Sequence, residues 1–134
     1  MYKKITIALL FFGATFFAFE AVIHFFGLPV LEHDKIFLPT HDRYIAILAA
    51  TYAGLLILIA TNIKKYGHLF ILVMMGILAQ MANALYISRT HAYARFDVVT
   101  LNQDLGIMGY TGLVWCIALW VAWCNSPNKN VPTN

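Results

Sequence analysis

Four long apolar runs limit what this chain can fold into. They cover residues 5–27, 44–63, 68–87 and 105–124 of the 134-residue sequence. Each is about 20 residues long, the length that a helix needs to cross the hydrocarbon core of a bilayer. Since unpaired backbone groups are costly in lipid, such runs are expected to be helical. The pattern predicts an all-α polytopic membrane protein: one four-helix transmembrane domain over residues 1–125, followed by a polar tail, 126–134.

The composition supports a membrane environment. The chain is 61% hydrophobic and 11% charged, whereas a soluble domain carries about 25% charged residues. It has no basic stripe and no zinc-finger spacing, which argues against nucleic acid as a partner. The expected partners are membrane lipids and other membrane-protein subunits. The first run is long and no A-x-A site ends it, so we expect a retained helix rather than a cleaved signal peptide.

The basic residues predict an orientation. Four spans place the N-terminus, the turn at 64–67 and the tail on one side. That side holds Lys3, Lys4, Lys64, Lys65 and Lys129, and the other side holds Lys35, Arg43, Arg89 and Arg95. Because cytoplasmic loops carry the excess of Lys and Arg, both termini are predicted to lie in the cytoplasm, with the protein in the plasma (inner) membrane. Residues 28–43 and 88–104 then form two structured outer loops.

Polar residues within the spans gather in the outer halves. Glu20 and His24 are four residues apart, so they share one face of the first helix. Gln80 and Asn83 are three residues apart in the third run. Ionisable groups are expensive within a membrane and usually face the bundle interior or a partner. We therefore expect Glu20 and His24 to mark a site.

One hypothesis for this site is a bound transition metal. Its candidate ligands are Glu20, His24, His33, His41 and His91, because imidazole nitrogens and carboxylate oxygens suit Zn, Fe and Cu. The spacing is neither the E-x-x-H of di-iron bundles nor H-E-x-x-H. A second hypothesis is that Glu20 and His24 form a hydrogen-bonded lock between the first helix and the outer loops. A lipid or quinone pocket and a proton path are further alternatives.

The other polar residues of the outer side are predicted to form a structural network. Its members are Asp34, Asp42, Arg43, Gln80, Asn83, Arg89, Arg95 and Asp97. Thr40 or Asp42 is expected to cap the second helix, and Asn102 or Asp104 the fourth, because their side-chain oxygens can accept from free helix N–H groups.

The sequence contains no complete catalytic set, and Walker and nucleophile-elbow motifs are absent, which favours a non-catalytic protein. Gly106, Gly109 and Gly112 resemble a small-residue seam for helix packing. The first functional hypothesis is a small accessory subunit that packs against and stabilises a larger membrane complex, with redox complexes as one class. The alternative is an autonomous protein that binds a metal, quinone or lipid in an outward-facing pocket built on Glu20 and His24.

Overall fold

The computed structural model describes residues 1–30, 38–90 and 98–125, with the side chains at 83–85, 87–90, 98–105 and 107–108 excepted. Every regular element in these ranges is helical. In chain order they are α1 (Tyr2–Phe26), α2 (Pro39–Thr61), α3 (Ile63–Tyr66), the 3₁₀ helix η2 (Gly67–Leu69), α4 (Phe70–Thr90) and α5 (Val98–Cys124). The predicted all-α, four-helix fold is confirmed.

The helices have the length and composition of membrane spans. Tyr2–Phe26, Pro39–Thr61 and Ile63–Ala82 are each long and apolar enough to cross a bilayer, and Gly109–Cys124 is a shorter apolar helix. At about 1.5 Å of rise per residue, twenty residues match a hydrocarbon core of about 30 Å. Large apolar side chains such as Phe12, Ile47 and Ile71 point outward, as expected where lipid is the solvent. The chain is a helical membrane protein.

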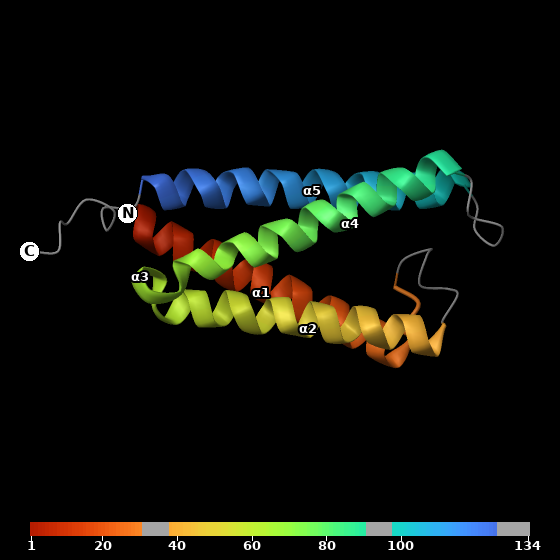
Figure 1. The fold of residues 1–134 in the computed structure, drawn as a ribbon, viewed down its shortest axis with the longest axis horizontal. Helices are drawn as coiled ribbons and strands as arrows, with labels where there is room; N and C mark the ends of the chain where they lie inside the picture. Colours follow the sequence, from red (N-terminus) through yellow and green to blue (C-terminus); the bar gives the residue numbers. More distant parts are fainter. Residues whose placement is uncertain (31–37, 91–97, 126–134) are drawn as a thin grey trace, which may run out of the picture.

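Figure 1 shows how the four long helices are arranged. Helices α1 and α2 run antiparallel along each other, and α5 lies beside α1. Helix α4 crosses diagonally, from α3 at one end to α5 at the opposite end. The start of α1, α3 and the end of α5 therefore lie together, and we call this end of the bundle the lysine end. The end of α1 and the start of α2 lie at the opposite end.

The core lies mainly between α1 and α2. Leu10 of α1 and Leu56 and Ile59 of α2 are fully buried, and Val73 of α4 and Leu119 of α5 complete the contact. Phe17 and Tyr52 pack edge to face across α1 and α2, with their ring centroids 5.4 Å apart. Aromatic pairs of this geometry stabilise a core beyond their buried area, by about 0.5–1.5 kcal/mol.

Three glycines let the helices approach closely. A Cβ built at Gly13 would clash with Trp115 of α5, and one at Gly76 would clash with the Tyr52 side chain of α2. At Gly67 the obstacle would be the ring of Trp123. The Trp115 indole also donates from Nε1 to the carbonyl oxygen of Leu9, at 3.0 Å. At each of these glycines, the absence of a side chain leaves space for an aromatic side chain from another helix.

The beginnings of two helices differ from the sequence-based expectation. Helix α2 begins at Pro39, with Leu38 as its N-cap and no side-chain cap, whereas its span was expected from residue 44. Proline suits the first helical position because its missing N–H would lack a partner there anyway. Helix α5 begins at Val98, so the prediction that Asn102 or Asp104 caps it is wrong.

The segment expected as a tight turn at 64–67 is helical. It is divided between α3 and η2. The Asn62 side chain accepts from the Lys65 backbone N–H at 3.1 Å, and this cap allows a new helical turn to begin directly after α2. At the end of α1, Gly27 adopts the left-handed conformation (φ 64°) and its N–H donates to the Ile23 carbonyl, which ends the helix.

Candidate functional site

His24 lies at the centre of a three-residue polar cluster that joins α1 and α2. Its Nε2 is 3.5 Å from Glu20 Oε2, one turn earlier in α1, and its Nδ1 is 3.1 Å from Asp42 Oδ1 in the first turn of α2. The side chains are largely buried, at 9% exposure for His24, 12% for Glu20 and 13% for Asp42. We call Glu20, His24 and Asp42 the polar clamp.

Asp42 has a second role within the clamp. Its Oδ2 accepts a hydrogen bond from the Leu38 backbone N–H at 2.7 Å, while the Asp42 N–H donates to the Leu38 carbonyl at 2.9 Å. This reciprocal pair fixes the first turn of α2, as a capping box does. One carboxylate thus orders the start of α2 and ties that start to α1.

Both ring nitrogens of His24 face carboxyl oxygens. The 3.1 Å contact to Asp42 has hydrogen-bond length, and the 3.5 Å contact to Glu20 is looser. Such a cluster can hold two helices together.

The predicted pairing of Glu20 with His24 is present, since the two side chains are in contact. Arg43 lies over the Phe25 ring, with Cζ 5.9 Å from the centroid, which is cation–π geometry. His41 and Gln80 are exposed. The structure therefore brings Glu20, His24 and Asp42 together, and His41 and Gln80 lie at the surface.

Several predicted site residues lie outside the described residues or side chains: His33, Asp34, Asn83, Arg89, His91, Arg95 and Asp97. Within the described part of the chain, no group of three or more His, Cys, Asp and Glu side chains is placed to hold a metal ion. The hypothesis of a transition-metal site on Glu20, His24, His33, His41 and His91 stays a prediction.

The contact between His24 and Asp42 was not predicted from the sequence. Asp42 was expected as a cap or network residue, and these two residues are 18 positions apart. One signal in the sequence was Pro39, because a proline at the first helical position puts Asp42 in the first turn of α2. That position brings Asp42 to the end of the bundle where α1 finishes.

The fold and the polar clamp define a class of protein, a small helical membrane protein whose first two helices are tied by a buried acid–histidine–acid cluster. Comparisons with protein-family models, with curated proteins and with solved structures found no match.

Proposed function

We propose that this protein is a small accessory subunit that packs within the membrane against a larger complex. One observation carries the proposal. Among the residues and side chains that the structure describes, a Cβ built at Gly106, Gly109 or Gly112 of α5 would meet no atom within 4 Å. We call the side of α5 that bears these three residues the glycine face. It contrasts with Gly13, Gly67 and Gly76, where aromatic side chains occupy the equivalent space.

An uncovered glycine face is costly for a chain on its own. Glycine in a helix interior is less favourable than alanine by about 0.5–1 kcal/mol per residue. In lipid, where apolar surface alone does not drive helices together, small residues stabilise pairs of helices by letting their backbones approach closely. A transmembrane helix of a partner subunit would recover at the glycine face the packing that this chain leaves unused.

The surroundings of the glycine face suit a helix as its occupant. At 3.6 residues per turn, three-residue steps rotate by about 300°, so Gly106 and Gly112 lie about 120° apart around α5. Tyr110, Leu113 and Val114 border these glycines and are exposed. Small residues on a helix surface let the backbone of a neighbouring helix approach closely.

The polar clamp has a supporting role in this proposal. The imidazole of His24 faces carboxylates on both sides, and all three side chains are at most 13% exposed. The clamp fixes α1 against α2, and α1 in turn holds α5 through the Trp115–Leu9 hydrogen bond. The glycine face is therefore presented by a bundle that the clamp stabilises.

We also propose that the lysine end lies in the cytoplasm, at the plasma membrane. Lys3, Lys4, Lys64 and Lys65 gather at that end, and the chain has no acidic residue in 1–19 or 43–96. Lysine and arginine are enriched in cytoplasmic loops, which supports this orientation.

Native mass spectrometry of the protein, extracted from its own membranes in mild detergent, tests the proposal. The expected result is the mass of a larger assembly for the wild type, and of the chain alone for Gly109→Leu. Gly54→Leu is the matched control, because Gly54 lies on α2 and a Cβ there also meets nothing within 4 Å; it should keep the assembly.

Two results would contradict the accessory-subunit role. One is a wild-type mass of a single chain or a homo-oligomer. The other is an unchanged assembly in Gly109→Leu. A single chain with a discrete small added mass, lost in Glu20→Gln, would instead support the alternative of a ligand pocket at the clamp.

A further inference from the structure

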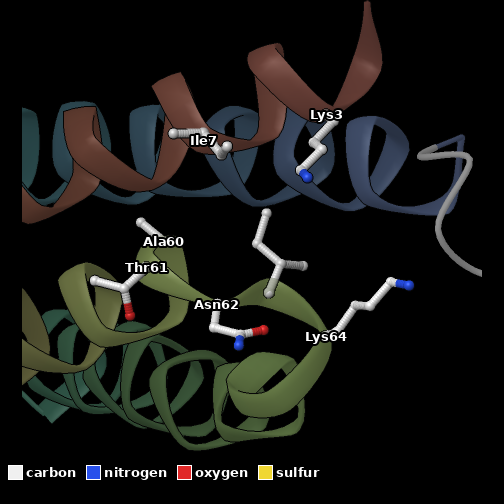
Figure 2. A pocket seen from close by; sticks show the side chains of 7 residues that line it. Lys3, Ile7, Ala60, Thr61, Asn62 and Lys64 are labelled. Carbon is white, nitrogen blue, oxygen red and sulfur yellow. The ribbon is translucent and has the colours of Figure 1, made fainter.

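A pocket with two lysines opens at the lysine end, between α1 and the junction of α2 with α3 (Figure 2). Its volume is about 350 Å³. It is lined by Lys3, Ile7, Ala60, Thr61, Asn62, Ile63 and Lys64. The Lys3 side chain extends from α1 toward the α2–α3 junction, whereas the Lys64 side chain extends outward from α3. Lys3 therefore points into the pocket, and Lys64 lines its outer rim from a different helix.

Among the described residues, the lining of the pocket carries positive charge and no acidic side chain. Its two charged lining residues, Lys3 and Lys64, are both cationic. Their sequence neighbours Lys4 and Lys65 add charge nearby, although the Lys65 ammonium lies over the Tyr66 ring, 5.0 Å from its centroid. A cavity lined by like charges concentrates counter-ions of the opposite sign, so the expected occupant is an anion.

The neutral part of the lining indicates what kind of anion fits. Asn62 also lines the pocket, and its Oδ1 accepts from the Lys65 N–H. Ile7, Ala60 and Ile63 form an apolar wall. A water molecule occupies about 30 Å³ of liquid, so the pocket has room for a phosphate ester. Donors beside an apolar wall match an anionic headgroup attached to an acyl chain.

The position of the pocket selects among phosphate-bearing molecules. It lies where α1 begins and α2 ends, at one end of helices that span a bilayer. Lysine-lined pockets between transmembrane helices at this depth meet lipid headgroups directly. We propose that Lys3 and Lys64 together bind the phosphate of an anionic phospholipid. This site is on α1–α3, away from the glycine face of α5, and does not depend on the accessory-subunit role.

The test uses the full-length protein, delipidated in a neutral detergent. Phosphatidylglycerol and phosphatidylcholine with identical acyl chains are titrated separately, and bound lipid is counted by native mass spectrometry. The wild type is expected to bind phosphatidylglycerol at least tenfold more tightly. From the usual contribution of a lysine near an anionic surface, Lys3→Gln/Lys64→Gln should weaken that binding about 10- to 30-fold.

The matched control is Lys4→Gln/Lys65→Gln, which removes the same charge from the same end of the bundle but from residues that do not line the pocket. It should change the affinity less than threefold. Equal losses in both double variants would overturn the proposal, because they would indicate a diffuse charge effect. Equal affinity of the wild type for the two lipids would overturn it as well.

A competition experiment separates a lipid from free phosphate. Inorganic phosphate at millimolar concentration is expected to leave phosphatidylglycerol bound. Its displacement of the lipid from the wild type would show a site for free phosphate and overturn the assignment to a phospholipid. An unchanged thermal transition in both double variants confirms that the comparison is made on folded protein.

Discussion

The α1–α2 pair and helix α5 use small residues in opposite ways. Gly13 on α1 is covered by Trp115, and the Tyr52 side chain of α2 fills the space beside Gly76. On α5, a Cβ at Gly106, Gly109 or Gly112 would meet none of the described atoms within 4 Å. Gly13 of α1 and Gly76 of α4 have their space filled within the chain. Gly54 of α2 is open as well, but α5 is the helix on which three open glycines recur at short spacing. The difference suggests which surface is used internally and which is left for a partner.

The two regions also differ in whether their described buried side chains are polar. The clamp residues Glu20, His24 and Asp42 are buried and in mutual contact at the α1–α2 interface. The core residues of α5, by contrast, are apolar: Cys116, Leu119 and Ala122 are its buried side chains among those described. Electrostatic contacts should therefore add to apolar packing in the stability of the α1–α2 pair, whereas apolar packing should dominate the attachment of α5.

The largest expected loss in the free energy of unfolding comes from removing the central residue of the polar clamp. His24→Ala leaves the Glu20 and Asp42 carboxylates buried without the imidazole between them. Removing one partner of a buried ionic group typically costs about 3–5 kcal/mol, and we expect a loss in the free energy of unfolding near the lower figure. The measurement is unfolding by SDS titration in mixed micelles.

His41→Ala is the control for this substitution. His41 is exposed and adjoins Asp42 in sequence, so its removal should change the unfolding free energy by less than about 0.5 kcal/mol. Equal losses for His24→Ala and His41→Ala would show that the clamp does not hold α1 to α2.

The next-largest effect on stability distinguishes Gly13, where a Cβ would meet Trp115, from Gly109, where a Cβ would meet none of the described atoms within 4 Å. Gly13→Leu forces a side chain into the space of the Trp115 ring, and overpacking of this kind costs about 1–3 kcal/mol. Gly109→Leu meets no atom within 4 Å of its Cβ and should leave the isolated chain as stable, or more stable by up to about 1 kcal/mol.

The same SDS titration measures both glycine variants. A loss of stability in Gly109→Leu comparable to that in Gly13→Leu would mean that α5 is packed on its glycine face within this chain. The contrast between the two regions would then fail, and with it the observation that supports a partner helix.

The smallest expected loss of stability concerns the hydrogen bond from Trp115 of α5 to Leu9 of α1. Trp115→Phe keeps an aromatic ring near Gly13 but removes the Nε1–H that donates to Leu9. The expected loss is about 1 kcal/mol, the usual net value of one hydrogen bond. Tyr110→Phe, at a side chain that is 71% exposed, is the control and should be neutral. A neutral Trp115→Phe would show that packing alone attaches α5.

Much of this fold could be predicted because lipid imposes a simple rule on the sequence. Apolar runs of bilayer length have to be helices, and the four runs correspond to α1, α2, α4 and α5. The contact between Glu20 and His24 followed from helical spacing alone. The helix starts were less predictable, since Pro39 falls in the segment 28–43 that was expected as an outer loop, although proline is also favourable as the first residue of a helix.

Contacts between helices could not be predicted in the same way. The pairing of His24 with Asp42 depends on how α2 is rotated about its axis, and the apolar runs show no strong one-sided pattern that would fix this rotation. Trp115 and Leu9 are 106 positions apart, and no spacing rule connects them. The Lys3–Lys64 pocket similarly requires α1 to lie beside the α2–α3 junction, which only the packed bundle shows.

The short sequence separation of the clamp has a consequence for the order of events during synthesis. His24 and Asp42 are 18 residues apart, and their contact involves no residue beyond α2. Because chains emerge from the ribosome N-terminus first, at about 5–20 residues per second, the α1–α2 hairpin can close before α4 and α5 are translated. The hairpin would then serve as the template on which the later helices dock, and Trp115 would be among the last side chains to reach its place.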